Sequence, residues 1–147
     1  MLLLEQVGYY AGFFDGEGCV SIRYDSRCDS HILKVSIANT DRRILDELAD
    51  IFGGAICGPY QKKEHHVPWY SWELQGRNAV PFLEAIRPYS RIKREQIELA
   101  FKIIETYSYK PGRGHKLPEH IKLIRKTLAE QIRNLKTKGK GLLKRAA

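Results

Sequence analysis

The chain has 147 residues, 43% of them hydrophobic, and a formal net charge of +8. This length and apolar content are typical of one compact domain with a single core. No apolar run approaches the roughly 20 residues that a membrane-spanning helix needs, and the opening leucines are too few and lack the basic flank of a signal peptide.

The first predicted element is a buried helix over residues 2–14, where apolar side chains dominate. Gly8 and Gly12 interrupt it four residues apart, and each costs roughly 1 kcal/mol relative to alanine inside a helix. Small residues at this spacing allow another helix backbone to approach closely. The face that carries Gly8 and Gly12 therefore predicts a close helical partner.

Two acidic residues, Asp15 and Glu17, follow at the C-terminal end of this helix and alternate with Gly16 and Gly18. The helix dipole is negative there, so carboxylates are disfavoured unless a cation lies beside them. Mg²⁺ binds carboxylate and carbonyl oxygens, and glycines leave the backbone free to supply the latter. The alternative is a helix C-cap in which both carboxylates are only solvated.

An alternating pattern then predicts a β-hairpin, with strands over residues 19–24 and 32–37 and a polar loop over residues 25–30. One side of each strand is expected to face the core, and the other is expected to be wet. The side chains predicted to face the core are Val20, Ile22, Tyr24, Val35 and Ile37.

A helix follows, capped by Thr40 or Asp41 and stopped by Gly53 and Gly54. Its predicted apolar stripe is Ile44, Leu45, Leu48, Ile51 and Phe52. A second hairpin is predicted from strands over residues 56–60 and 68–75, joined by a charged tip over residues 61–67. In its second strand, Tyr70, Trp72 and Leu74 are expected to face the core, and Trp69, Ser71 and Glu73 are expected to lie outside.

Three further helices are predicted, over residues 78–86, 91–107 and 118–136, with a linker over residues 108–116. The second has Ile92, Leu99, Ile103 and Ile104 as inward positions. The last has an apolar stripe of Ile121, Ile124, Leu128, Ile132 and Leu135. Its opposite side carries Lys122, Arg125, Lys126, Arg133 and Lys136.

The basic charge is concentrated at the C-terminal end. Residues 108–147 hold 12 of the 25 lysines and arginines but only 2 of the 17 acidic residues. This excess predicts a polyanionic partner such as a nucleic acid, and a solubilising tail is the alternative. The Lys- and Gly-rich segment after Thr137 is expected to be mobile.

The three cysteines, Cys19, Cys28 and Cys57, are odd in number and lack the spacing of metal ligands. This usage predicts an intracellular, reducing compartment, either the cytoplasm or an organelle matrix.

The nonapeptide YAGFFDGEG, from Tyr10 to Gly18, resembles the signature of the LAGLIDADG homing endonucleases position for position. The identical positions are Ala11, Gly12, Asp15 and Gly18. Among the others, Phe13 and Phe14 stand for an aliphatic pair, Gly16 for a second small residue, Glu17 for the final acid and Tyr10 for the opening leucine.

The resemblance implies an α+β fold in the order α-β-β-α-β-β-α, with an antiparallel, saddle-shaped sheet and additional C-terminal helices. The order of elements predicted from periodicity is the same. We therefore expect a single endonuclease domain over residues 1–147, with a core over residues 1–107 and a basic C-terminal helix and tail over residues 108–147.

The resemblance also implies an intron-encoded, site-specific DNA endonuclease that makes a metal-dependent double-strand break in a long pseudo-palindromic target. Double-stranded DNA is the expected partner and Mg²⁺ the expected metal, with no membrane and no small-molecule substrate. One copy of the motif implies a homodimer that pairs through Gly8, Ala11 and Gly12. An RNA-binding intron maturase and a catalytically inactive DNA-binding regulator use the same scaffold, and both remain alternatives.

Individual roles follow from the same resemblance. Glu17 is the expected metal ligand, with the Gly16 carbonyl as an accessory ligand, whereas Asp15 is expected to structure the helix junction. Lys93 matches a lysine beside the scissile phosphate, where it would stabilise developing charge; the alternative is a surface lysine. Asn39 lies where relatives carry a glutamine, so it is expected either to position water or to cap the next helix.

DNA is expected to lie across the wet faces of both hairpins, because the major groove admits a two-stranded ribbon. The candidate base readers are Ser21, Arg23, Asp25, Arg27, Lys34 and Ser36 in the first hairpin, and Tyr60, Lys62, Lys63, His65, Trp69, Ser71 and Glu73 in the second. Each is also an ordinary exposed residue of a strand or loop. The C-terminal lysines and arginines are expected to contact phosphates, which position a protein on DNA without specifying sequence.

Overall fold

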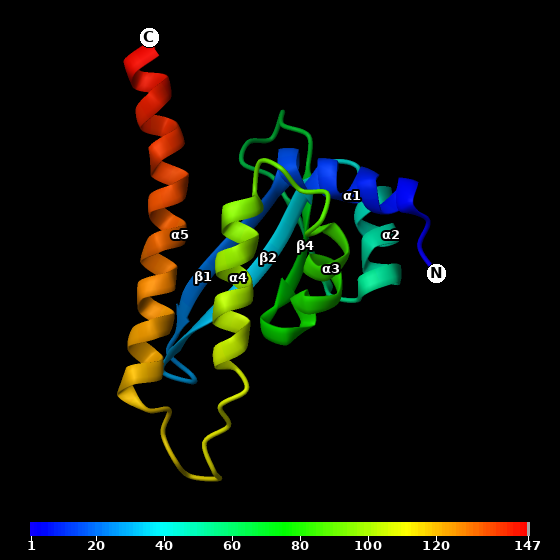
Figure 1. Cartoon of the computed structure of the whole chain (residues 1–147). Coiled ribbons are helices and arrows are strands. Elements are labelled where there is room, and N and C mark those ends of the chain that lie inside the picture. Colours follow the sequence, from blue (N-terminus) through cyan, green and yellow to red (C-terminus); the bar gives the residue numbers. More distant parts are fainter. Residues whose placement is uncertain (147) are drawn as a thin grey trace.

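The computed structural model describes the backbone of residues 1–146 and the side chains of residues 1–136. Its centre is a four-stranded antiparallel sheet in the order β1-β2-β4-β3. The strands are β1 (Gly18–Asp25), β2 (Ser30–Asn39), β3 (Ala55–Tyr60) and β4 (Trp69–Gln75). The helices are α1 (Leu4–Glu17), α2 (Arg42–Phe52), α3 (Val80–Ile86), α4 (Arg94–Thr106) and α5 (Glu119–Ala146), with a 3₁₀ helix η1 (Gly76–Ala79) before α3. The predicted α-β-β-α-β-β-α order with additional helices is confirmed (Figure 1).

One face of the sheet packs against the helices and carries the core. Val20, Val35 and Leu74 lie opposite one another on three neighbouring strands and are all buried. Phe14 of α1 packs edge to face on Phe82 of α3, at the centre of the same cluster. The other face carries Ser21, Arg23, Lys34, Ser36 and Glu73, and we call it the open face.

Side-chain contacts settle how α1 and α2 are held. The buried Tyr10 of α1 donates a hydrogen bond to Glu47 of α2, and burial, together with that carboxylate, raises the pKa of Tyr10 to about 12. Asp41 rather than Thr40 caps α2, because its carboxylate accepts a hydrogen bond of 3.0 Å from the Arg43 amide. Gly53 ends α2 with φ of 74°, a conformation that glycine adopts without strain.

The helices α4 and α5 lie side by side and run in opposite directions, joined by a linker at one end of the molecule (Figure 1). Leu128, Ala129 and Ile132 of α5 belong to the core cluster, so the core extends past residue 107. The helix also continues to Ala146, beyond the predicted end at Lys136. The phosphate contacts predicted for residues 137–147 lie outside the described side chains. No described helix is long and apolar enough to cross a membrane.

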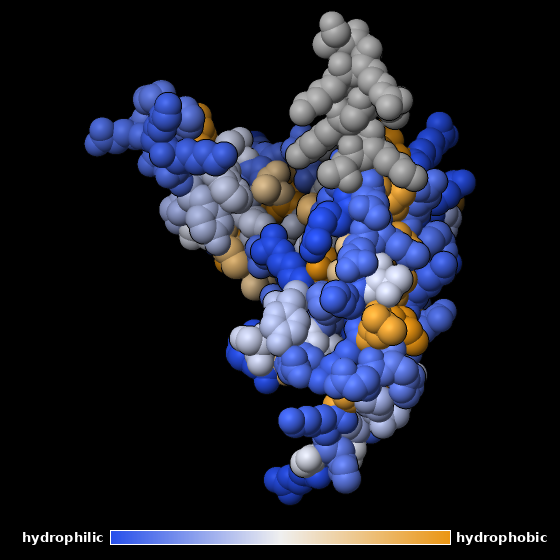
Figure 2. Space-filling view, turned by 90° about the vertical axis from the view of Figure 1, so that its left-hand side faces the viewer, coloured by the Kyte–Doolittle hydropathy of each residue, from blue (hydrophilic) through white to orange (hydrophobic). Residues whose placement is uncertain are grey.

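The structure corrects several side chains predicted to face inward. The exposed ones are Tyr24, Ile51, Ile92 and Ile124. Tyr24 lies at the far end of β1, where its hydroxyl donates to Asp29 at 2.7 Å, and Ile92 precedes α4 instead of lying within it. Seen from the side of α5, the surface is mainly hydrophilic with scattered apolar side chains (Figure 2).

Candidate active site

The motif forms the last two turns of α1 and the first residue of β1. Gly18 packs tightly there, because a Cβ at this position would overlap the Phe14 ring and the Phe14 carbonyl. The Gly18 amide donates to the same carbonyl and ends the helix. Glycine is therefore required at this junction by contacts within one protomer.

Asp15 is buried, with 9% of its surface exposed, and its carboxylate organises the segment before α4. It accepts hydrogen bonds from the Ser90 hydroxyl, from the Arg91 amide at 2.8 Å and from the Ile92 and Lys93 amides, both at 3.2 Å. Burial alone would raise the pKa of Asp15, but these hydrogen bonds together outweigh it and lower the pKa. Asp15 thus has a structural role, as predicted, but it organises the segment before α4 rather than the end of its own helix.

The same contacts explain why α4 begins at Arg94 rather than at the predicted Arg91. The amides of Arg91, Ile92 and Lys93 turn toward Asp15 and leave the helical path. Ser90 was not among the candidate residues, although a serine shortly before a helix is a common capping signal. That signal identifies it in retrospect.

Lys93 lies at the N-cap of α4, and its side chain returns to α1. The Lys93 ammonium donates a hydrogen bond of 2.7 Å to the carbonyl of Asp15. This contact fixes a positive charge at the negative end of α1, two residues from Glu17. The structure therefore places Lys93 against the end of α1, the segment that carries Gly16 and Glu17.

Glu17 is exposed, and it forms no ion pair with any of the side chains that the structure describes. Gly16 lies in the last helical turn, where carbonyl oxygens have no partner within the helix. Across residues 1–136 no three His, Cys, Asp or Glu side chains cluster as a complete metal site. Mg²⁺ is commonly held by one or two carboxylates together with substrate phosphates and water, so one free carboxylate beside a free carbonyl fits such an ion.

Asn39 ends β2 and is half-buried. Its side-chain oxygen accepts a hydrogen bond of 2.8 Å from the Asp41 amide, which stabilises the turn into α2. This contact matches the capping alternative. The role of Asn39 in positioning water stays a prediction.

The first hairpin presents most of its candidate readers on the open face. Ser21 lies opposite Lys34, and Ser36 lies beside both Cys19 and Glu73 on the neighbouring strands. The remaining candidates of this hairpin are Arg23, which is exposed, and Asp25 and Arg27 at its tip. Arg27 donates two hydrogen bonds, of 3.0 and 2.8 Å, to the Asp25 carboxylate.

A charged network occupies the middle of the open face. The Lys34 ammonium lies 2.7 Å from the Glu73 carboxylate, and both side chains are about one-fifth exposed. The Ser71 hydroxyl donates to the same carboxylate at 3.2 Å. Ser71 was predicted to lie outside, but it is buried beneath this network because Glu73 and the neighbouring strands cover it. Glu73 can accept from a cytosine only if Lys34 moves.

The second hairpin ends in an exposed, polar tip. Lys62, Lys63 and His65 are exposed there, and the Gln61 amide donates to the Glu64 and His66 carbonyls, which closes the tip on itself. At its base, the rings of Tyr60 and Trp69 pack together with centroids 4.6 Å apart.

Of the three residues of α1 predicted to form the dimer interface, two are exposed and one is buried. Gly8 and Gly12 are exposed, and a Cβ added to either meets no atom within 4 Å. Ala11 was predicted to lie in the interface, but it is fully buried in the protomer's own core because it shares a helix face with Phe14. Packing within one protomer therefore does not require a glycine at position 8 or 12, whereas it does require a small residue at Ala11.

The basic side predicted for α5 is only partly confirmed. Arg125 is buried rather than solvated, and Lys122 forms an ion pair of 2.7 Å with Asp29. Lys136 reaches the start of β1, where its ammonium donates to the Cys19 sulfur at 3.2 Å. The basic residues of α5 therefore contact both ends of the first hairpin.

Known proteins resemble this chain in sequence and in fold. The family model described as LAGLIDADG endonuclease matches residues 10–89. Among curated proteins, the reverse gyrase of Methanocaldococcus jannaschii is 26% identical over 92 residues, which are 63% of this chain. The chain spans only 6% of the length of that relative.

Several solved structures have the same fold. The homing endonuclease I-CvuI, in complex with its target in the presence of 2 mM Ca, matches with a TM-score of 0.68 and 21% identity, over 90% of this chain and 82% of that one. The archaeal intron-encoded homing endonuclease I-Vdi141I, complexed with DNA, matches with a TM-score of 0.63 and 19% identity, over 89% of this chain and 84% of that one. The LAGLIDADG meganuclease I-AabMI, bound to uncleaved DNA, also has a TM-score of 0.63 and 19% identity, but the match covers 84% of this chain and only 43% of that one. At such identities the likeness shows the fold.

Proposed function

The chain belongs to the LAGLIDADG endonuclease family, and on this premise we propose that it is a site-specific, homing-type DNA endonuclease. The observation that carries the proposal is the hydrogen bond of the Lys93 ammonium to the Asp15 carbonyl, which holds this cation at the end of α1, one and two residues from Gly16 and Glu17. A free carboxylate, a free carbonyl and a fixed ammonium are suited to a phosphodiester and a divalent cation.

The open face is the proposed DNA-binding surface. The eight residues of β1 extend about 25 Å at roughly 3.3 Å per residue, which matches about seven to eight base pairs of duplex. Arg23 is suited to the acceptors of guanine, and Ser21 and Ser36 can pair with either donors or acceptors. Two protomers would cover about twice that length, in addition to the central base pairs.

The reaction is hydrolysis of one phosphodiester in each strand. A divalent cation supplies charge stabilisation and an activated water; I-CvuI has been crystallised with DNA in the presence of Ca and of Mg, and we propose Mg²⁺ here. Glu17 and the Gly16 carbonyl would hold that ion. Lys93, fixed by its bond to the Asp15 carbonyl, would place positive charge beside the phosphate as its charge develops.

A homodimer is the proposed assembly. The chain contains one copy of the motif, and it corresponds to less than half of I-AabMI. Gly8 and Gly12 leave an exposed, sterically open strip on α1 that a second α1 can approach closely. A two-fold axis there would bring two copies of Glu17 together, one for each DNA strand.

The dimer is tested with Gly12→Arg. The wild-type chain is expected to have twice the mass of the 17.0 kDa protomer in light scattering at micromolar concentration. Gly12→Arg is expected to have the protomer mass and a preserved thermal unfolding transition, because Gly12 is exposed and a Cβ added there meets no atom within 4 Å. Thr127→Arg, on an exposed position of α5, is the control and should remain dimeric. A wild-type protomer mass, or a dimeric Gly12→Arg, contradicts the proposal.

The activity is tested by incubating the protein with Mg²⁺ and a plasmid library of randomised pseudo-palindromic sites, then sequencing the cut ends. Staggered cuts at one long motif, absent for Glu17→Gln, are the expected result. Selective binding without cutting would instead indicate a DNA-binding regulator, and selective binding to an intron RNA alone would indicate a maturase.

A further inference from the structure

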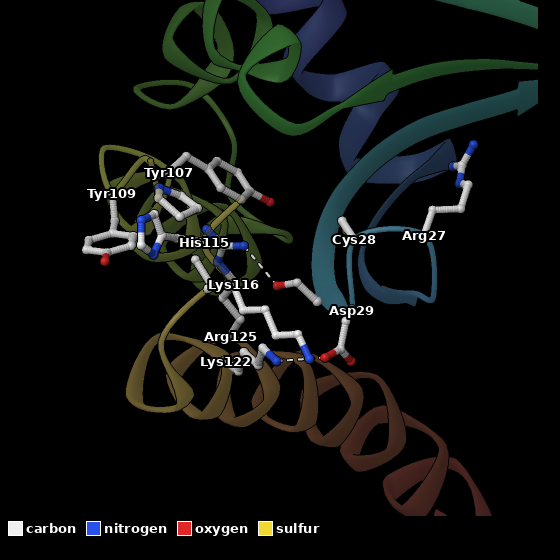
Figure 3. Close-up of a pocket in the computed structure, with 12 residues that line it drawn as sticks. Arg27, Cys28, Asp29, Tyr107, Tyr109, His115, Lys116, Lys122 and Arg125 are labelled. Atoms are coloured by element: carbon white, nitrogen blue, oxygen red, sulfur yellow. Dashed lines mark hydrogen bonds and ion pairs between the residues drawn. The ribbon is translucent and has the colours of Figure 1, made fainter. Parts of the chain in front are cut away.

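A second basic site lies at the opposite end of the sheet from Glu17. It is a pocket of about 570 Å³ between the tip of the first hairpin, the linker that follows α4 and the first turns of α5 (Figure 3). The hairpin contributes Arg27 to Ser30, the linker contributes Tyr109, His115 and Lys116, and α5 contributes Lys122 and Arg125. This volume is in the range of small-ligand sites.

The pocket carries an excess of positive charge. Four cationic side chains, Arg27, Lys116, Lys122 and Arg125, line it, and Asp29 is the one acidic side chain among its described lining residues. Lys122 is paired with Asp29 at 2.7 Å, and Arg27 is paired at 2.8 Å with Asp25, which lies outside the pocket lining. The unpaired positive charge of the described lining therefore comes from Lys116 and Arg125. Lys116 is exposed and forms no ion pair with a described side chain.

Arg125 is the buried floor of the pocket. It is only 7% exposed, and its guanidinium donates to the Thr106 hydroxyl at 2.8 Å, the Ser30 hydroxyl at 2.9 Å and the Thr106 carbonyl at 3.3 Å. It also stacks over the Tyr107 ring, 4.7 Å from the ring centre. All these partners are neutral, and no carboxylate among residues 1–136 pairs with it. A buried cation without a counter-charge is costly, and an anion in the pocket would supply one.

The pocket adjoins the proposed DNA-binding surface through a shared residue. Arg27, exposed at the hairpin tip, also borders a second hollow on the open face, which Arg23, Lys34 and Gln75 line. The pocket is separated from Glu17 by the eight residues of β1, about 25 Å. An anion there is therefore distinct from the phosphate at the reaction centre and lies at the outer end of the DNA-binding surface.

We propose that this pocket binds a backbone phosphate of the DNA that flanks the outer end of each half-site, so that a homodimer holds its target at both ends. That the phosphate belongs to DNA rests on the proposed function. That the pocket binds a phosphate follows from its own charge and does not depend on that function. Lys116 would contact the phosphate at the rim, and Arg125 would supply the buried positive charge. Arg27 could join them only by leaving its ion pair with Asp25. Free inorganic phosphate shares the same chemistry and is the competing source.

The test compares the Kd of duplexes that end at the outer edge of the selected site with duplexes that extend four base pairs further on each side. Binding is measured by fluorescence anisotropy over a range of salt, in a Glu17→Gln background that leaves the duplex intact. Extension is expected to tighten binding about tenfold and to steepen the log–log salt slope by about two, one phosphate per protomer.

The Lys116→Gln variant is expected to lose both gains. Its matched control is Lys110→Gln, an exposed lysine of the same linker that does not line the pocket, and it should keep both. Equal gains from extension in Lys116→Gln and wild type would overturn the proposal.

A second arm measures the thermal unfolding midpoint in inorganic phosphate against chloride at matched ionic strength. A phosphate-dependent rise in the wild type that Lys116→Gln lacks, without any effect of duplex length, would overturn the DNA source and assign the pocket to free phosphate. Because this arm needs no DNA, it decides the pocket even if the library yields no cut site and the proposed function fails.

Discussion

Glu17→Gln is expected to abolish DNA cleavage, with a loss of about a thousandfold or more, while target binding remains nearly unchanged. The substitution keeps the size of the side chain and removes the charge with which we expect it to hold a divalent cation, an interaction that contributes several kcal/mol to the transition state. Glu17 is exposed, so it contributes little to the free energy of unfolding. Removing a carboxylate from the negative end of α1 should leave the unfolding midpoint equal or slightly higher.

The measurement is single-turnover cleavage of the selected site in Mg²⁺, alongside anisotropy with the same duplex. Glu5→Gln is the matched control, because Glu5 is also exposed on α1 but lies in its first turn. It should cut at the wild-type rate. Wild-type cleavage by Glu17→Gln would refute the assignment of the active site.

Asp15→Asn should be the most damaging single substitution for stability near the site. The native carboxylate accepts four hydrogen bonds, three of them from backbone amides, and an asparagine would turn an NH₂ group toward some of those donors. We expect a loss of about 3 kcal/mol, which corresponds to a thermal midpoint about 6–12 °C lower for a chain of this size. Cleavage should also fall, because the Lys93 segment loses its anchor.

The effect should depend on pH in a defined direction. The folded pKa of Asp15 is lowered, so its stabilisation is fully present above the unfolded value of about 3.9 and is lost as the pH falls through the folded pKa. The wild-type advantage over Asp15→Asn in chemical denaturation should therefore persist from pH 7 to about pH 5 and shrink below about pH 4. A difference that stays constant down to pH 3 would argue against a charged Asp15 as the cause.

Asp46→Asn provides the control for a lost carboxylate. Asp46 pairs with Arg42 on the exposed side of α2 at 3.3 Å, with both side chains about half exposed. Such surface pairs contribute little, so its midpoint should change by no more than about 2 °C.

Local patterns predicted the sheet well because strand alternation directly reports which side is buried. Val20, Val35 and Leu74 were each predicted to face the core from their own strand, and the register places them in one row. The Asp41 cap and the glycine stop of α2 are equally local. Such features depend on neighbours only a few residues away.

The predictions that were wrong concern positions whose structure depends on residues far away in the chain. The start of α4 depends on Asp15, more than 70 residues earlier in the chain, so the helical pattern beginning at Arg91 was misleading. Arg125 has the position of a solvated residue in the periodic pattern of α5, but it is buried because Thr106 and Ser30, both distant in the chain, accept its hydrogen bonds. Ala11 belongs to the core although it lies next to Gly12, because a small residue fits a tight core as well as an interface.

The anchoring of Lys93 also bears on the order in which the protein folds. The hydrogen bonds between Asp15 and residues 90–93 hold Lys93 in place, and they close a loop of 75 residues or more. The entropic cost of such closure is offset only after the intervening sheet has brought the two ends together. The strands that would contact DNA can therefore assemble before the ammonium reaches the end of α1, and we expect cutting competence to be acquired last.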